Sequence, residues 1–597
     1  MLALFAGHLC FSLWPALFEI RNDFANYYAP ARALVLGRAP QRLYERDAFQ
    51  LEVRRAGLAQ LGSFVPHPPA NALLLVPLAI FSPTVAKAAW TLLLVLAYAA
   101  ALPVLRSLTG LSGWTLALVL LLPTSSLKNA LAYGQPYPLL LLLLSLSLLL
   151  VARGRHSLGG LALAPVLALK LYSLPHVLFL SIGARWRAVA GLLVGFALIT
   201  GLGVLALGAE VHTTYLTQIL PRSLRGEIQD PYSPLWGSIS SLTHRLFQAE
   251  PDLNPSPATD APAFVALTTR VASAFLVLLA LAARPSGEPV IALRRQWSAL
   301  TLAALAASPL TQSYHFVLLP LPVALLLAER PTRVRALLVL ALMTFATSPL
   351  PHYFAPLAHG WANLLAYPRL FSVVALLVLA LRGLLSRASV LLCGALALAA
   401  GLFAPTAPVA PDWQKVQEAR GYLAAEPLAC EGGLAWVATL GDRYVVRHSD
   451  GRLLRGEGDF VAPRCVAGRL DASLLTGDRS ALADGDSDRD ARGLVRVAAD
   501  GALLASDAGG AERVLARGRF RRPRLSPDGR LIAVASWEDG SWDIRVVDRE
   551  SGASRRATSQ PSNEIEPAWT ADGASILFAS DWRRGLGSTA LYRTELR

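Results

Sequence analysis

The sequence predicts a membrane protein with many α-helical spans, followed by a soluble all-β region. Of its 597 residues, 54% are hydrophobic and 16% are charged, and the mean hydropathy is +0.44, which is too apolar for an ordinary soluble chain. After residue 410 the long apolar runs stop, and runs of strand length alternate with Asp-Gly and Gly-Gly turns. We therefore expect a helical membrane domain at 1–410 and a β-rich domain at 411–597.

The net charge of +14 belongs to the predicted membrane domain. Residues 411–597 contain 27 Lys+Arg and 28 Asp+Glu, so 28 of the 55 basic residues and 13 of the 41 acidic ones fall in 1–410. A nucleic-acid-binding protein would carry its basic patch on a soluble domain. The distribution instead favours contact with anionic lipid and with phosphate groups, so membrane lipids and not nucleic acid are the expected partners.

A helix that crosses the hydrocarbon core needs about 20 apolar residues. We expect about 11–13 spans, and Met1 is followed directly by apolar residues, which favours a first span over a cleaved signal peptide. The candidate runs are 2–20, 69–82, 84–105, 113–133, 136–152, 158–182, 186–208, 263–283, 297–313, 315–329, 335–351, 363–383 and 389–408.

Arginines in short loops predict the orientation of these spans. Arginine clusters near 185, 284–295, 330–335 and 382–387 mark cytoplasmic loops, although Arg153 and Arg155 do not fit the alternation. The loop at 21–66 and the C-terminal domain are then extracytoplasmic, together with the loops near 210–261, 309–315 and 351–362. Arginine outnumbers lysine 51 to 4, which is typical of a GC-rich bacterium, so we expect a multi-pass protein of a bacterial inner membrane.

Two amphipathic helices are predicted in the first loop, at about 28–37 and 45–60. We expect them to lie along the membrane surface with their arginines facing lipid phosphate.

Asp23 follows the first apolar run and opens the segment Asp-Phe-Ala-Asn-Tyr-Tyr at 23–28. A small-residue run leads from there to Gly37, Pro40 and Tyr44. This segment resembles the first-loop signature of glycosyltransferase family 87, in the GT-C superfamily, whose members use polyprenyl-phosphate sugars. The resemblance implies inverting transfer of a hexose, usually mannose, to an extracytoplasmic glycan or lipid, with Asp23 as general base. Taken alone, Asp23 would be read as a helix cap or an ion-pair partner.

Four further segments extend the resemblance as far as residue 315. Tyr137 stands where the family has asparagine, and the segment at 232–237 departs from the family pattern. The four segments are Gly134-Gln135, Lys170 to Pro175, Tyr232 to Gly237 and Ser308 to His315.

Lys170 is the one lysine within 129–414, and a charge in an apolar run costs about 3 kcal/mol unless it has a partner. A donor phosphate would be such a partner, and snorkelling to the interface is the alternative. The other candidates for binding the donor's phosphate or sugar are Arg32, Arg38, Gln135, Tyr314 and His315. No metal and no cofactor is expected, because the lipid-linked sugar is itself a substrate and the sequence contains no phosphate-binding Gly loop or metal-ligand cluster.

Two repeats with Asp-Gly turns, at 526–529 and 570–573, lie 44 residues apart in the C-terminal domain. This spacing is the length of a propeller blade, and the repeats resemble those of TolB-type β-propellers. The domain has room for four blades, and we expect it to bind a glycan or an envelope partner. Cys430 and Cys465 can form a disulfide if the domain faces an oxidising compartment.

A polytopic transporter or lipid-carrier flippase with an extracytoplasmic binding domain is the alternative function. Kinked helices and a membrane-embedded Lys170 would suit it, but transporters usually contain internal repeats with matching broken helices, and the sequence shows none. A binding protein that uses its helices only as an anchor would need one or two of them.

Overall fold

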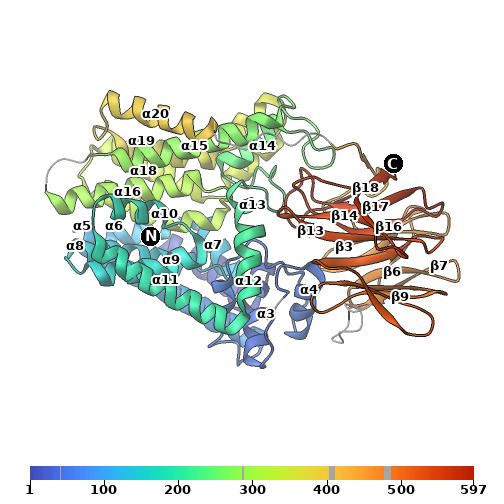
Figure 1. Cartoon of the computed structure of the whole chain (residues 1–597). Coiled ribbons are helices and arrows are strands. Elements are labelled where there is room, and N and C mark those ends of the chain that lie inside the picture. The colour runs from blue at the N-terminus through green and yellow to red at the C-terminus, as the bar shows by residue number, and fades with distance from the viewer. Residues whose placement is uncertain (41, 285–287, 403–410, 476–485, 597) are drawn as a thin grey trace.

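The computed structural model describes residues 1–40, 42–284, 288–402, 411–475 and 486–596. Helices form one half of the molecule and strands the other, and the β-rich half lies against one end of the helical half (Figure 1). The predicted fold class is therefore confirmed. The predicted domain boundary adjoins residues 403–410, which lie outside the described residues; the last described helix ends at Leu402, and the first strand begins at Gln414.

The helical half contains twenty described α-helices. They are α1 (Leu2–His8), α2 (Trp14–Phe18), α3 (Asn22–Val35), α4 (Arg46–Arg55), α5 (Pro83–Thr109), α6 (Gly113–Leu121), α7 (Thr124–Tyr133), α8 (Tyr137–Ala152), α9 (His156–Lys170), α10 (Leu174–Ile182), α11 (Trp186–Leu207), α12 (Ala209–Thr214), α13 (Leu220–Leu224), α14 (Ile239–Phe247), α15 (Pro262–Ala282), α16 (Pro289–Ala307), α17 (Pro320–Ala328), α18 (Arg333–Thr347), α19 (Pro368–Leu381) and α20 (Arg387–Leu402). Short 3-10 or π segments complete them: η1 (Leu9–Leu13), η2 (Pro69–Leu73), η3 (Tyr215–Ile219), η4 (Ser313–Leu318), η5 (Leu350–Leu357) and η6 (Gly360–Leu365).

Among the described residues, three helices are long and apolar enough to cross a membrane singly, namely α5, α11 and α15. Three bent pairs of helices would raise the number of spans to six, and five shorter apolar helices lie beside them. The helical half thus has several candidate spans, and the figure of 11–13 stays a prediction.

Prolines explain where the helices differ from the predicted runs. The run at 69–82 is not a spanning helix, because Pro68, Pro69 and Pro77 limit it to η2 and turns. The run at 158–182 is split into α9 and α10 at Leu171, whose φ is +46°. This break follows Lys170 directly, so it leaves that side chain at a helix end.

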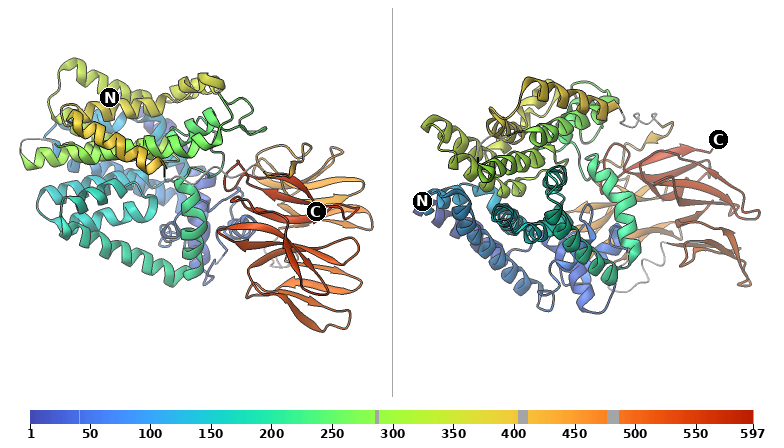
Figure 2. Two further views of the ribbon diagram at one scale, coloured as in Figure 1. Left: turned by 45° about the horizontal axis from the view of Figure 1, so that its top comes forward. Right: turned by 60° about the vertical axis from the view of Figure 1, so that its left-hand side comes forward.

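The C-terminal domain consists of antiparallel sheets that stand side by side around a centre (Figure 2). The described residues form five sheets, one more than the four blades for which the sequence has room. The strands, sheet by sheet, are β2 (Ala425–Cys430), β3 (Gly433–Leu440), β4 (Arg443–His448) and β5 (Leu453–Leu454); β6 (Phe460–Val466) and β7 (Arg469–Leu474); β8 (Ser487–Asp490), β9 (Gly493–Val497), β10 (Leu503–Ser506) and β11 (Glu512–Ala516); β12 (Phe520–Leu525), β13 (Leu531–Glu538), β14 (Ser541–Asp548) and β15 (Ser554–Arg556); β16 (Glu564–Trp569), β17 (Ser575–Ser580), β18 (Ala590–Glu595) and β1 (Gln414–Lys415).

The first strand of the domain completes its last sheet. β1 pairs with β18, where Gln414 is opposite Arg593, so the two ends of the domain meet in one blade. β16 of this last sheet also packs against β2 of the first sheet. The pairing ties the start of the domain to its end, as closed propellers require.

One irregularity recurs in four sheets, in strands β2, β6, β12 and β16. A residue with positive φ precedes a proline, and the strand register shifts there. The residues and their φ values are Glu426 (48°), Ala462 (47°), Arg522 (53°) and Glu566 (55°). A bulge of this kind re-aims the side chain that it carries, and three of these four side chains contact the same helix, α4, or its ion pairs.

Helix α4 docks on these bulges through ion pairs. Arg46 lies 2.7 Å from Glu426 and 3.3 Å from Glu566, and Asp47 lies 2.7 Å from Arg522. The two helices predicted in the first loop are thus present as α3 and α4, but the expected orientation of the arginines is wrong for α4. Arg46 faces carboxylates of the C-terminal domain instead of lipid phosphate.

A second contact joins the C-terminal domain to the loop predicted at 210–261. Arg222 lies 2.7 Å from Asp581, and Arg584, whose side chain is fully buried, lies 2.9 Å from Glu250. The first loop, this loop and the C-terminal domain therefore occupy one side of the helical half. Two of the predicted cytoplasmic loops also lie together, since the Arg284 main-chain N–H donates to the Leu384 carbonyl. Which side is cytoplasmic stays a prediction.

Candidate active site

Asp23 lies in the first turn of α3, directly after the bend of 41° that separates α1 and α2 from α3. Gln135 Nε2 donates to Asp23 Oδ2 at 2.7 Å, and the Tyr27 hydroxyl donates to Gln135 Oε1 at 2.7 Å. Because Tyr27 needs the amide oxygen, the amide nitrogen is turned toward Asp23. The carboxylate is thus held in one orientation, as an acceptor.

Gly134 permits this approach. Its φ is +68°, and a Cβ there would lie 3.1 Å from the ring of Phe24, the residue after Asp23. A larger residue would therefore strain the backbone and push α3 away from Gln135.

Lys170, at the end of α9, extends toward the same carboxylate. Its Nζ lies 3.3 Å from His67 Nδ1 and over the rings of Tyr27 and Tyr137, at 5.7 and 5.9 Å from their centroids. It is close enough to Asp23 for the two charges to interact. A half-buried ammonium with aromatic faces on two sides and one imidazole partner keeps donors available for an anion.

Tyr314 and His315 come from η4, on the opposite wall. His315 Nδ1 accepts the main-chain N–H of Gln312 at 2.9 Å, so a neutral ring carries its proton on Nε2 and can donate it. The Tyr314 hydroxyl interacts with the Asp23 carboxylate. Both rings pack on Tyr137, with centroids 5.5 Å and 4.5 Å from it.

Two cavities meet at Asp23. The inner cavity, of about 440 Å³, is lined by residues of the helical half, among them Gln135, Lys170 and His315. The interdomain cavity, of about 630 Å³, has walls from both halves of the chain. The residues that line both cavities are Asp23, Asn26, Val65, Gln229 and Gln312.

The structure does not bring every predicted residue to this place. Arg32 donates to the carbonyls of Ala79 and Ile80, at 2.7 and 3.2 Å, and Arg38 lies 3.3 Å from Glu52. Neither arginine lines either of these two cavities. The predicted residues that gather around the junction are Asp23, Gln135, Lys170, Tyr314 and His315.

Sequence reasoning missed His67 and Tyr27 as members of the site. His67 sits in the run Val-Pro-His-Pro-Pro at 65–69, where a polar residue between prolines is a usable signal. Tyr27 belongs to the Asp23 segment itself, so its role in orienting Gln135 depends on the fold.

One acidic group in the described residues has the spacing of a metal site. The carboxylate oxygens of Asp47, Glu426 and Glu566 lie within 4.8 Å of one another. Arg46 and Arg522 pair with these carboxylates, so two of the three negative charges are already compensated by guanidinium groups. The group therefore belongs to the interface of α4 with the C-terminal domain.

Residues 64–309 match the model of glycosyltransferase family 87. This part of the helical half is therefore similar to glycosyltransferase family 87. The match includes Gln135 and Lys170, begins after Asp23 and ends before Tyr314. In a helical half that matches this family, a half-buried carboxylate between two cavities is a candidate site of sugar transfer. No curated protein matches the chain.

Solved structures to which the chain is similar include two TolB proteins and a protease, each at 18% identity. The TolB of Agrobacterium tumefaciens has a TM-score of 0.18 over 27% of this chain and 70% of its own length. The TolB of Acinetobacter baumannii has a TM-score of 0.17 over 28% and 40%, and the tricorn protease 0.15 over 25% and 14%. The chain thus spans less than half of the length of the last two. Its propeller-like arrangement follows from the order of its own sheets.

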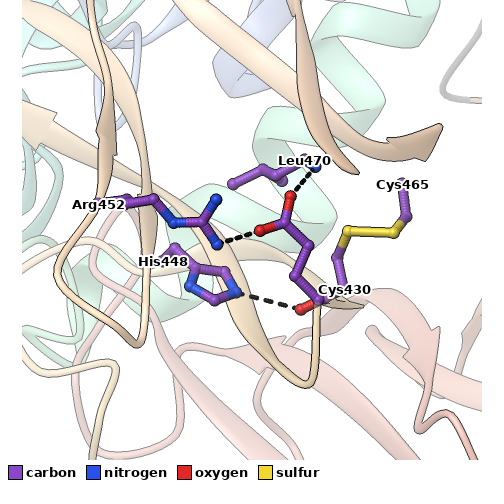
Figure 3. Close-up of a disulfide and its surroundings, with 6 residues drawn as sticks. Cys430, His448, Arg452, Cys465 and Leu470 are labelled. Carbon is purple, nitrogen blue, oxygen red and sulfur yellow. Dashed lines mark hydrogen bonds and ion pairs between the residues drawn. A yellow bond between two sulfur atoms is a disulfide. The ribbon is translucent and has the colours of Figure 1, made fainter. Parts of the chain in front are cut away.

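A disulfide joins Cys430 to Cys465, whose Cα atoms are 5.6 Å apart (Figure 3). It connects the end of β2 to β6 of the next sheet. His448 lies 3.1 Å from the Cys430 carbonyl, and the side chain of Glu431 binds both Arg452 and the main-chain N–H of Leu470 beside it. The bond thus links two neighbouring blades at a place that these contacts already order.

Proposed function

We propose that the protein transfers a hexose, with mannose the first candidate, from a polyprenyl-phosphate donor to an acceptor hydroxyl, with inversion at the anomeric carbon. The match of residues 64–309 to glycosyltransferase family 87 supports the class, a membrane glycosyltransferase. The observation that carries the finer proposal is the position of Asp23, at the junction of an inner cavity and an interdomain cavity.

The inner cavity suits the lipid-linked donor. Apolar side chains such as Leu169, Leu171 and Val277 line it beside the cationic Lys170. The apolar wall can hold the first isoprene units, and Lys170 and His315 can donate to the phosphate. This gives the Lys170 ammonium the anionic partner that its half-buried, apolar position favours.

The reaction needs one general base and one set of hydrogen-bond donors to the leaving phosphate. The oxygen of the acceptor hydroxyl attacks the anomeric carbon from the interdomain side, and the bond from that carbon to the phosphate oxygen breaks. The hydroxyl proton passes to the Asp23 carboxylate, and the polyprenyl phosphate leaves with the bonding electron pair toward Lys170 and His315. Gln135 holds Asp23 Oδ2 throughout and so fixes the base in position.

The donor is a substrate, so the proposal includes no cofactor. We place the site on the outer face of a bacterial inner membrane, because the short arginine-rich loops are predicted to be cytoplasmic. The C-terminal domain and the Asp23 loop are then extracytoplasmic, where the domain can also meet an envelope partner. We set the transporter alternative aside, since the chain matches a glycosyltransferase family.

Purified full-length protein should transfer label from polyprenyl-phosphate [14C]mannose to glycan acceptors, and the product should have the anomeric configuration opposite to that of the donor. Polyprenyl-phosphate glucose and a nucleotide-linked mannose are the comparison donors. Transfer from the nucleotide sugar alone would refute the lipid-linked donor. Retention of the donor's configuration would refute single displacement with Asp23 as base.

A further inference from the structure

The charged groups of the interdomain cavity neutralise one another. Asp47 pairs with Arg522 at 2.7 Å, and Glu566 pairs with Arg46 at 3.3 Å. Apart from Asp23, every carboxylate among the described lining residues has an arginine within 4.0 Å. A strongly charged ligand would have to break such pairs, so this cavity favours an uncharged one.

The remaining polar groups of the wall are amides and hydroxyls. Asn22 and Gln218 come from the helical half, and Thr439 and Thr589 come from the C-terminal domain. Amides and hydroxyls can both donate and accept hydrogen bonds, which matches a ligand with many hydroxyl groups. The aliphatic wall that suits a lipid chain belongs to the inner cavity instead.

Tyr422 adds an aromatic surface to this wall. The residue is 40% exposed, more than any other aromatic in the described part of the C-terminal domain, and it lines the interdomain cavity. Ser588 Oγ donates to its carbonyl at 2.8 Å, and the fully buried Arg584 donates to it at 3.3 Å. The exposed ring therefore stands on a backbone that is held in place.

From these observations we infer that the acceptor is an uncharged glycan chain held in the interdomain cavity, with Tyr422 as the surface on which one of its sugars packs. The C–H face of a pyranose packs on an aromatic ring, and its hydroxyls bind amides and hydroxyls around it. The volume of about 630 Å³ lies within the range of cavities that hold drug-sized ligands, about 300–1,000 Å³, so a short oligosaccharide fits. This inference rests on the proposed function, because it places the attacking hydroxyl of that glycan at Asp23.

The first experiment compares acceptors of two lengths in full-length Tyr422→Ala, Tyr422→Trp and Leu474→Ala proteins. Leu474 is a matched control, because it is 41% exposed on the same domain and lines neither cavity. The readout is the ratio of kcat/KM for a long linear oligosaccharide to that for a disaccharide of the same sugar. We expect this ratio to fall about tenfold in Tyr422→Ala, the scale of one lost aromatic contact, and to be retained in the other two proteins. Equal ratios in Tyr422→Ala and Leu474→Ala would overturn the inference.

The second experiment measures binding without turnover, using wild-type protein and no sugar donor. Calorimetry should detect the oligosaccharide, and Tyr422→Ala should weaken its binding about tenfold. Binding of a Ser/Thr-rich peptide instead of the oligosaccharide would overturn the inference in favour of a protein acceptor. If the protein binds the oligosaccharide through Tyr422 but does not use polyprenyl-phosphate sugars, the glycan site is supported and the proposed donor is refuted. Failure of the glycan site and failure of the proposed donor are therefore distinguishable.

Discussion

Gln135 donates a hydrogen bond of 2.7 Å to Asp23, across 112 residues of sequence. The bond joins the start of α3 to the turn before α8, and Tyr27 fixes its direction by donating to the other end of the same amide. The carboxylate is therefore held by neutral groups, with the cation of Lys170 further away, toward the inner cavity. This arrangement leaves Asp23 as a base and separates it from the groups proposed to bind phosphate.

Replacing Lys170 should impair the use of the donor. Lys170→Met removes the side chain proposed to donate hydrogen bonds to the phosphate. Loss of one such transition-state contact typically lowers kcat by about 10²–10³. Lys170→Arg should recover part of the rate, since it restores the charge. Lys128→Met is the control, because Lys128 is exposed and lines neither cavity. A loss in Lys170→Met that appears only as a raised KM for the acceptor would contradict the assignment.

Replacing Arg46 should destabilise the docking of α4 on the C-terminal domain. Arg46→Met leaves the Glu426 and Glu566 carboxylates without this guanidinium, and breaking a buried pair costs about 3–5 kcal/mol. Thermal unfolding of the full chain measures the effect. Arg38→Met is the control, because the Arg38 side chain is 35% exposed and its pair with Glu52 should contribute about 0–1 kcal/mol. Equal melting of the two variants would show that the Arg46 cluster contributes no more than a surface pair.

Removing the disulfide should loosen the first two blades. The bond closes a loop of 35 residues, and loss of a disulfide typically costs about 2–4 kcal/mol. Denaturant unfolding of Cys430→Ser/Cys465→Ser protein measures this loss. Thiol counting in unreduced, denatured wild-type protein should find Cys10 and Cys393 reactive. Four reactive thiols in protein taken from an oxidising compartment would contradict both the pairing and the predicted outer location.

Glu564 should make the stability of the C-terminal domain decrease as the pH rises. Burial, with the Asp581 carboxylate nearby, raises the pKa of Glu564 to about 9, so the folded state keeps a proton that the unfolded state loses above about 4.5. The stability that the protonated Glu564 contributes therefore declines as the pH rises from about 4.5 to about 9. Glu564→Gln should have the wild-type Tm at pH 5 and a Tm at least about 2–4 °C higher at pH 9.

The exposed Glu512→Gln is the control for this pH dependence, since Glu512 pairs with Arg496 at the surface. A constant Tm difference between Glu564→Gln and wild type across this pH range would contradict the raised pKa.

Hydropathy was enough to predict the two halves of the fold, because membrane spans and strands differ in the length of their apolar runs. The individual blades were harder to predict from the sequence. Asp528-Gly529 and Asp572-Gly573 mark the last two, whereas the first two share only the bulge before Pro427 and Pro463. A proline that follows a variable residue does not by itself identify a blade, and the register shift that marks the bulge is visible only in the structure.

The site was predictable where its residues lie in short motifs, as Asp23, Gln135 and Lys170 do. The partners of Arg46 were not, since Glu426 lies 380 residues away and its side chain is aimed by a bulge. The contribution of Tyr422 depends on the same docking. Arg32 resembled a phosphate ligand by position, yet its guanidinium binds the carbonyl of Ala79.

In the proposed reaction Asp23 takes the proton of the acceptor hydroxyl, and Asp23→Asn tests this role most directly. The amide keeps the size of the side chain and an oxygen for Gln135, so the melting temperature should stay at the wild-type value. Initial rates of transfer from a radiolabelled polyprenyl-phosphate sugar should fall by about 10²–10⁴, the usual contribution of a general base. Retention of more than about a tenth of the wild-type rate in a folded Asp23→Asn protein would contradict the role of Asp23 as general base.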